Sequence, residues 1–296
     1  MPRSKISAPH IGAFFMGKIG YFIFTKTLGI YINVLSFWSR EKASVLAYQL
    51  FSNPRVGRLT KENLPQVLKD AFTQTVHIDG NHVQTYTWKG SDTVTLLVHG
   101  WESNASRWEK FLPYLVKSGN TIIAVDAPAH GLSGGKEFDI PQYAAFIDVL
   151  IRTHKPKHII GHSIGGIASM YYQHHYTNHN LEKMVLLGAP SDYKILIQNY
   201  VKMLSLNKAI LEVLLNRTKE KFRIDIEDFS GAKFLENSRL QGIIAHDVGH
   251  RVVSFSEAKK LAASWKHATF IETIGLGHSL HDDELYEKIM KFLTKS

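Results

Sequence analysis

The segment from Lys157 to Gly166 constrains the fold of this chain more than any other feature of its sequence. It reads KHIIGHSIGG, a short apolar run that predicts a β-strand and passes directly into a pattern typical of a helix. Gly161, Ser163 and Gly165 form Gly-x-Ser-x-Gly at the bend. A serine on so sharp a turn has strained backbone angles, and its neighbours two positions away must be nearly free of side chains so that strand and helix can approach. The segment therefore predicts a strand–turn–helix unit that presents the Ser163 hydroxyl as a nucleophile.

The helix predicted after this serine begins at Ile164 and runs to about Tyr172. Its first N–H groups and the positive end of its dipole point back at Ser163, which favours an oxyanion forming there. Glycine and serine are common residues, so the five-residue pattern alone is weak evidence for such chemistry. Two other segments, one on each side of it in the chain, strengthen the prediction.

The upstream segment, TLLVHGW at 95–101, is an apolar strand that ends in His-Gly-Trp, and the downstream segment, FIETIGLGH at 270–278, ends in a glycine-hinged loop that presents His278. This order resembles the α/β-hydrolase fold family, in which strand ends bring an oxyanion loop, a serine nucleophile and a histidine base together at one edge of the sheet. The segment VDAPAHGLSG at 125–134 is similar to the family's Asp-x-Pro-x-His-Gly-x-Ser loop. The resemblance covers roughly residues 75–296.

The elements predicted along this region alternate between strand and helix. Strands are expected at 94–99, 121–126, 158–161, 183–188 and 242–245, and helices near 105–117, 140–153 and 164–172. Before them, 76–78 and 83–88 alternate at period two around Asp79-Gly80-Asn81, which predicts a hairpin. The expected fold class is α/β, a mostly parallel sheet with helices on both faces, in one domain over 75–296.

Residues 193–238 interrupt the alternation. They contain two helical stretches, 193–206 and 208–215, followed by a charged segment at 218–228. An insertion at this point resembles the family's helical lid over the active site. Apolar residues of the first stretch could face an acyl chain or could be the core side of an ordinary helix, which is the commoner use of this spacing. These residues are Leu196, Ile197, Tyr200, Val201 and Met203.

Residues 1–74 form a basic, apolar and aromatic N-terminal segment that is expected to be helical. Ten Lys and Arg against three acids in residues 1–70 account for seven of the nine net positive charges of the chain. Lys18 and Lys26 interrupt the apolar stretch 11–38 and argue against a simple membrane span. Two interpretations follow: a helical pair that packs on the hydrolase body, which we favour, or peripheral membrane contact through residues 1–40.

The composition excludes several other classes of function. The chain has no cysteine, so disulfides and thiolate metal sites are excluded, and its sixteen histidines show no metal-binding spacing. Neither a cofactor nor a metal is expected. The basic residues are spread along the chain without a nucleic-acid-binding motif, so nucleic acid is not an expected partner. We expect a cytoplasmic protein, with membrane association as the alternative, and the sequence gives no oligomeric state.

The resemblance implies nucleophilic acyl transfer with a role for each motif. Ser163 would attack a carbonyl carbon, and His278 would accept its proton and then donate it to the leaving group. The backbone N–H groups of Trp101 and Ile164 would form the oxyanion hole. The expected function is a serine hydrolase that cleaves a carboxylic ester or a related small-molecule acyl substrate through an acyl-enzyme, with thioesterase and acyltransferase as alternatives.

Three further histidines lie near these motifs, namely His99, His130 and His162. In the resembled family, loop histidines such as the first two usually brace the backbone near the site. The third, beside the serine, is expected to pack or to support the site, and none of the three is needed for the chemistry.

The acid is where the sequence departs from the family pattern. Aligning the segment HDVGHRVVS at 246–254 on Val253 places His250 where the family has its acid, and a histidine supplies no negative charge to the imidazolium of His278. Asp247, three residues earlier, is the first choice for the acid, and Asp192, after the preceding strand, is the second. If neither serves, the alternative function is a catalytically impaired hydrolase-like protein that binds a ligand.

Overall fold

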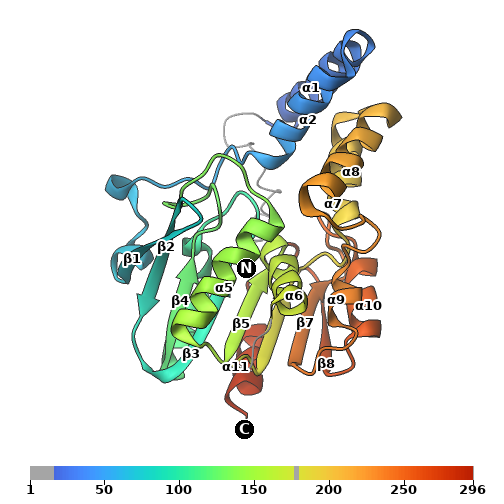
Figure 1. Ribbon diagram of the computed structural model, residues 1–296. Coiled ribbons are helices and arrows are strands. Elements are labelled where there is room, and N and C mark those ends of the chain that lie inside the picture. The colour runs from blue at the N-terminus through green and yellow to red at the C-terminus, as the bar shows by residue number, and fades with distance from the viewer. Residues whose placement is uncertain (1–16, 177–179, 296) are drawn as a thin grey trace.

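The computed structural model describes residues 17–176 and 180–295, which contain an eight-stranded sheet with helices on both faces (Figure 1). The strand order is β1-β2-β4-β3-β5-β6-β7-β8. The strands are Phe72–Ile78 (β1), Asn81–Trp88 (β2), Ser91–Val98 (β3), Asn120–Val125 (β4), His158–His162 (β5), Lys183–Leu187 (β6), Gln241–Asp247 (β7) and Ala268–Thr273 (β8). β2 is antiparallel to both of its neighbours, and the six strands β3 to β8 are parallel. The predicted α/β fold and its hairpin are confirmed.

The helices follow the same alternation after β3. They are Lys18–Trp38 (α1), Arg40–Ser52 (α2), Gln66–Lys69 (α3), Leu112–Lys117 (α4), Ile140–His154 (α5), Ile164–His175 (α6), Tyr193–Leu204 (α7), Lys208–Phe222 (α8), Gly231–Leu235 (α9), Phe255–Ser264 (α10) and Asp283–Thr294 (α11), with 3-10 turns at Lys61–Asn63 (η1) and Ala105–Trp108 (η2). The helix expected over 105–117 is therefore divided into η2 and α4. The second helix of the insertion is longer than expected, because α8 continues through Thr218 to Phe222.

Two apolar cores hold the helices on the sheet. Alternate residues of each strand face opposite sides, so Leu96 and Val98 of β3 join the core under α5, α6 and α10, whereas Leu97 joins the core under α4 and α11. β5 and β6 are buried along their whole length because both of their faces are covered. This arrangement places the carboxyl ends of β3, β5, β7 and β8 along one edge of the sheet, where the predicted site residues lie.

Helix α5 shows how local sequence sets these elements. Asp139 precedes it and accepts a hydrogen bond from the N–H of Gln142, and Pro141 lies in the first turn, where no intrahelical donor is required. The helix ends at His154, and the capping residue Lys155 has a φ of 47°. Its apolar side is buried against the sheet, so packing of one face stabilises the helix.

Helices α7, α8 and α9 form the insertion between β6 and β7, and α1 and α2 lie beside α7 and α8 (Figure 1). Ile197 and Tyr200 of α7 are buried in the main core, and three other apolar residues of α7 pack against it. Those three are Leu196, Val201 and Met203. The apolar side of α7 therefore serves packing, the commoner of the two uses expected.

Helix α1 is fixed along the insertion by polar contacts and by one glycine. Lys26 Nζ donates to the carbonyl of Met203 at 2.9 Å, and Asn33 Nδ2 donates to the carbonyl of Ser205 at 2.9 Å. A Cβ on Gly29 would lie 1.6 Å from the carbonyl oxygen of Leu204, so only glycine permits this approach. Within the described residues, α1 contacts α7 and α2 contacts α8, and residues 1–16 lie outside this part. The helical segment expected over 1–74 stops before its predicted end, because β1 begins at Phe72. By length and composition alone, α1 could also cross a membrane.

Candidate active site

Ser163 occupies the bend between β5 and α6 with φ 54° and ψ −123°, a conformation that L-residues rarely adopt. A Cβ on Gly161 would lie 2.7 Å from Gly166 Cα, and one on Gly165 would lie 2.3 Å from the carbonyl oxygen of His99. The glycines of Gly-x-Ser-x-Gly are thus needed for close backbone approach, as the sequence predicts. The N–H of Ser163 donates to the carbonyl of Leu187 at 2.8 Å, which anchors the strained residue to β6.

The loop after β3 lies directly against this serine. A Cβ on Gly100 would be 3.0 Å from Ser163 Cβ, so the backbone of the loop and the serine side chain are in contact. Neither the N–H of Trp101 nor that of Ile164 has a hydrogen-bond acceptor within residues 17–176 and 180–295. Both backbone donors are therefore unpaired within the described residues.

Two buried histidines hold the surrounding loops. His99 Nε2 accepts from the N–H of Ala127 at 2.9 Å, so its Nδ1–H donates to the carbonyl of Gly100 at 2.7 Å. His130 Nε2 likewise accepts from the N–H of Glu102 at 2.9 Å. Burial lowers the pKa of His130 to about 4, and that of His99 lies well below its ordinary range for the same reason. The expectation that these histidines brace the backbone is confirmed.

His278 lies in the loop after β8, where Gly275 and Gly277 both have positive φ. His162, next to the serine, donates from Nε2 to the carbonyl of His278 at 2.8 Å, and the two rings are 4.7 Å apart. This bond ties the histidine loop to the residue before Ser163. Burial, followed by the neighbouring His250, lowers the pKa of His278 to about 3.

The hydrogen-bond partner of His278 is His250, whose Nε2 lies 2.8 Å from His278 Nδ1. The other ring nitrogen of His250, Nδ1, accepts from the N–H of Val253 at 2.8 Å and from that of Val252 at 3.2 Å. His246 stacks on the His250 ring at 4.6 Å. Burial lowers the pKa of His250 to about 4. A histidine thus occupies the position that the family pattern gives to an acid.

The structure does not bring either predicted acid to His278. Asp247 Oδ1 accepts from the N–H of Gly249 at 2.9 Å, and its Oδ2 accepts from the N–H of Leu276 at 2.8 Å, so this carboxylate joins the loops after β7 and β8. Asp192 accepts from Ser230 and from Lys260, both at 2.6 Å. Sequence spacing could not separate these cases, because it does not say which side chain of the turn faces the histidine.

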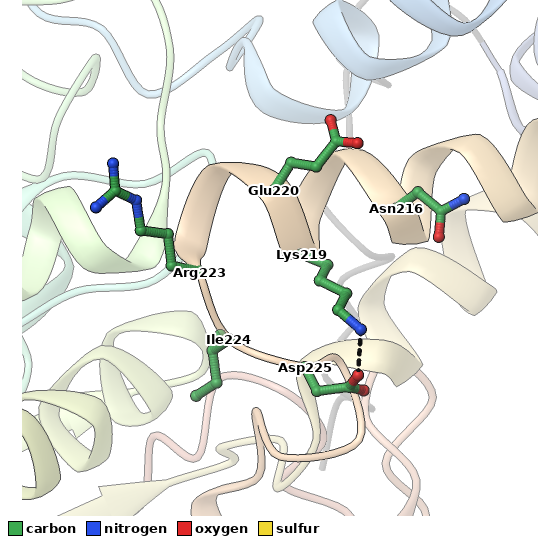
Figure 2. Close-up of a pocket in the computed structure, with 6 residues that line it drawn as sticks. All are labelled: Asn216, Lys219, Glu220, Arg223, Ile224 and Asp225. Carbon is green, nitrogen blue, oxygen red and sulfur yellow. Dashed lines mark hydrogen bonds and ion pairs between the residues drawn. The ribbon is translucent and has the colours of Figure 1, made fainter.

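Two surface hollows of the described chain lie away from the predicted site residues. No group of three or more His, Asp or Glu side chains in residues 17–176 and 180–295 is arranged to hold a metal ion. Figure 2 shows a surface hollow of about 560 Å³ at the end of α8, lined by polar residues such as Lys219 and Asp225, which form an ion pair at 2.8 Å. None of its lining residues is a predicted site residue.

Comparison with known proteins identifies the fold. A family model described as alpha/beta hydrolase fold matches residues 93–240, half of the chain. Among solved structures, a bromoperoxidase from Bacillus anthracis is 20% identical, with a TM-score of 0.60, and the match covers 76% of this chain and 100% of that one. A putative lipase from Acinetobacter baumannii AYE is 16% identical with a TM-score of 0.59, covering 79% and 98%. Est816, an N-acyl homoserine lactone degrading enzyme, is 14% identical with a TM-score of 0.57, covering 75% and 100%. The match of the family model shows that this chain belongs to the alpha/beta hydrolase fold family.

Proposed function

We propose that this protein is a serine hydrolase that cleaves a carboxylic ester or a related small-molecule acyl compound through an acyl-enzyme on Ser163. One observation carries the proposal: Ser163 is held at φ 54° between the Gly100 loop and the start of α6. Such strain persists only where the surrounding structure imposes it, and it clusters at functional sites. The similar solved structures support an acyl substrate, since one is described as a putative lipase and another as an N-acyl homoserine lactone degrading enzyme.

The proposed roles follow from position. Ser163 Oγ attacks the acyl carbon, and the N–H groups of Trp101 and Ile164 bind the oxygen that becomes negative. His278 exchanges the proton with Ser163 and the leaving group. Asp247 acts through the backbone, since its two oxygens hold the loops that carry His250 and His278. Helices α7 to α9 would cover the acyl group as a lid.

A fluorophosphonate probe tests the nucleophile directly, because it reacts covalently with activated serine hydroxyls. We expect labelling of the native protein that is lost in Ser163→Ala. Ser169→Ala is the matched control, since Ser169 lies on the same helix with its hydroxyl bonded to the carbonyl of Gly165, and labelling should persist. A folded wild-type protein that takes up no probe would refute an activated serine.

A second function, a hydrolase-like binding protein, is favoured by the same histidine pair that departs from the family pattern. Without a carboxylate at His278, the loss in turnover can reach about 10⁴. This alternative predicts no hydrolysis of short p-nitrophenyl esters even at high enzyme concentration, together with ligand binding that Ser163→Ala preserves. Hydrolysis above that of Ser163→Ala would exclude it.

The exposed face of α1 supports peripheral contact with an anionic lipid surface. Phe37 is 85% exposed and Trp38 80% exposed, at the end of a helix that carries a continuous set of exposed apolar side chains. This exposed face of α1 comprises Ile19, Phe22, Ile23, Phe24, Ile30, Tyr31, Val34, Phe37 and Trp38. Apolar faces of this size are rare on proteins that act in water alone.

Charge around this face indicates which occupant it would take. Residues 1–40 contain no Asp or Glu, and Arg40 and Lys42 follow Trp38 in exposed positions with the exposed Glu41 between them. Lys208 is exposed at the start of α8, where it pairs with Glu212 at 3.8 Å, and it lies next to Asn207, whose N–H donates to Asn33 of α1. Aromatic side chains flanked by basic residues are typical of interfacial helices that bind anionic lipids. The contacts between α1 and the insertion argue for a helix that lies along the surface rather than one that spans it.

Vesicles of phosphatidylglycerol and phosphatidylcholine provide the test. We expect the wild-type protein to co-sediment with them at low salt, and Phe37→Ser with Trp38→Ser to weaken binding at least tenfold. Phe72→Ser is the matched control, because Phe72 is an exposed aromatic residue on β1, 60% exposed and outside this face. Equal binding by the double variant and the wild type would contradict the assignment, as would no binding at low salt.

A further inference from the structure

We infer that His250 is a positioning residue that holds His278 in the tautomer with hydrogen on Nε2, so that the nitrogen needed as a base is already protonated. The inference rests on the proposed function only for its consequence on catalysis. The tautomer itself follows from hydrogen bonds that the structure shows, and it reverses the arrangement in which an acid accepts Nδ1–H and leaves Nε2 free.

The tautomer of His250 is set by its backbone neighbours. The Nδ1 of His250 faces two backbone N–H groups, those of Val253 at 2.8 Å and Val252 at 3.2 Å. A backbone N–H can only donate, so this nitrogen must carry a lone pair. Because a neutral imidazole has one hydrogen, the hydrogen of His250 lies on Nε2. Backbone geometry therefore decides this tautomer.

The tautomer of His250 in turn determines that of His278. His250 Nε2–H points at His278 Nδ1 across 2.8 Å, and it can only donate there. His278 Nδ1 must then accept, so the hydrogen of His278 lies on Nε2. The backbone carbonyl oxygen of His278 accepts a hydrogen bond from His162. In this state His278 Nε2 carries the hydrogen and has no lone pair with which to take a proton.

The surroundings of the His250–His278 pair disfavour protonation of either ring to an imidazolium. Three cationic or neutral-basic groups face His278: Arg107 from η2, His162 from β5 and His246 from β7. Neither ring of the His250–His278 pair bonds to a carboxylate in the described part of the chain. Burial disfavours the charged form of both rings, which lowers their pKa further. A second proton on His278 is thus opposed by burial and by the Arg107 guanidinium, and on His250 burial outweighs the nearby Asp247 carboxylate, which favours the charged form.

This tautomer affects the proton that the Ser163 hydroxyl releases during attack. Attack forms the bond between Ser163 Oγ and the acyl carbon, moves the carbonyl π electrons onto oxygen and releases the hydroxyl proton, which needs a nitrogen lone pair. His278 Nε2 can supply one only if its hydrogen moves to Nδ1. His250 Nε2 would then have to accept, and its own hydrogen would move to Nδ1, directed at the N–H groups of Val252 and Val253. The backbone resists this exchange, so acylation is slow.

The tautomer can be measured without any substrate. In protein labelled with ¹⁵N-histidine, long-range ¹H–¹⁵N correlations distinguish protonated from unprotonated ring nitrogens, and spectra of His250→Asn and His278→Asn assign the signals. We expect a protonated Nε2 and an unprotonated Nδ1 in both residues at pH 7. A protonated Nδ1 on His278 would overturn the inference.

The kinetic test replaces the positioning residue by the acid that the family pattern has there. In His250→Asp, the carboxylate should accept Nδ1–H of His278 and free Nε2, and we expect fluorophosphonate labelling of Ser163 to accelerate at least 100-fold. His250→Asn is the matched control, because it has the same size without the charge, and its gain should be smaller. The carboxylate should also raise the pKa of His278, so labelling of His250→Asp should fall below about pH 6.5, whereas the wild-type rate should show no such fall between pH 7 and 5.

The outcomes separate this inference from the proposed function. Labelling of Ser163 together with Nδ1–H on His278 would keep the hydrolase and overturn the tautomer. The expected tautomer without labelling of the wild type or of a folded His250→Asp would keep the positioning role and refute the hydrolase. An unchanged labelling rate in a folded His250→Asp that does label would show that His250 does not limit the base.

Discussion

Gly29→Ala tests the docking of α1 on the insertion, because the close approach at this residue leaves no room for a side chain. The added Cβ would lie 1.6 Å from the carbonyl oxygen of Leu204 and 2.7 Å from its carbonyl carbon. Both of these atoms belong to the backbone, so no rotamer change relieves the overlap. An ordinary contact distance of about 3.5 Å requires α1 to move away by roughly 2 Å.

The size of the effect follows from the hydrogen bonds that this movement breaks. Lys26 to Met203, Asn33 to Ser205 and Asn207 to Asn33 each span 2.9 Å, and none survives a shift of this size with good geometry. At about 1 kcal/mol each, their loss costs roughly 3 kcal/mol. Alanine gains about 1 kcal/mol over glycine in a helix interior, so the net loss is about 2 kcal/mol.

Hydrogen exchange of the α1 amides and urea unfolding together provide the assay. We expect faster exchange in α1 of Gly29→Ala and a free energy of unfolding that is lower by about 2 kcal/mol for the unit containing α1 and α7. Gly17→Ala is the control, since nothing lies within 4 Å of a Cβ at Gly17. A variant that gains the 1 kcal/mol of helix propensity with unchanged exchange would refute the docking.

Three further outcomes are expected. Gly165→Ala should abolish Ser163 labelling and lower stability, measured by probe uptake and thermal melting, because the Cβ would lie 2.3 Å from the carbonyl oxygen of His99; normal labelling would contradict the backbone approach. The free energy of unfolding should be full above about pH 6.5 and fall toward pH 4. Buried His130 and His278 have pKa values of about 4 and 3, so they stay neutral while the same residues in the unfolded chain take up protons. Each histidine should lower the free energy of unfolding by roughly 2 kcal/mol at pH 5, as measured by urea unfolding. Asp247→Asn should destabilise the loops by about 1–3 kcal/mol, as seen in urea unfolding, because an amide nitrogen replaces one acceptor of a backbone N–H; an unchanged midpoint would contradict that role.

The sequence alone determined the architecture and the position of the strained serine. Alternating strand and helix patterns specify a parallel sheet, and Gly-x-Ser-x-Gly specifies a bend that Ser163 has in the structure, because both depend on residues close together in the chain. The bracing roles of His99 and His130 were also accessible from the motifs in which they lie.

The tertiary structure decided what His278 pairs with and where α1 lies. Asp247 and His250 are three residues apart in one turn, and only the packing of the loops after β7 and β8 selects which of them faces His278. The direction of two backbone N–H groups at His250 then fixes a hydrogen position on His278, 28 residues from His250 in the chain. Local sequence patterns report periodicity and chain flexibility, whereas the partner of a side chain depends on contacts between distant segments, and those exist only once the sheet has assembled.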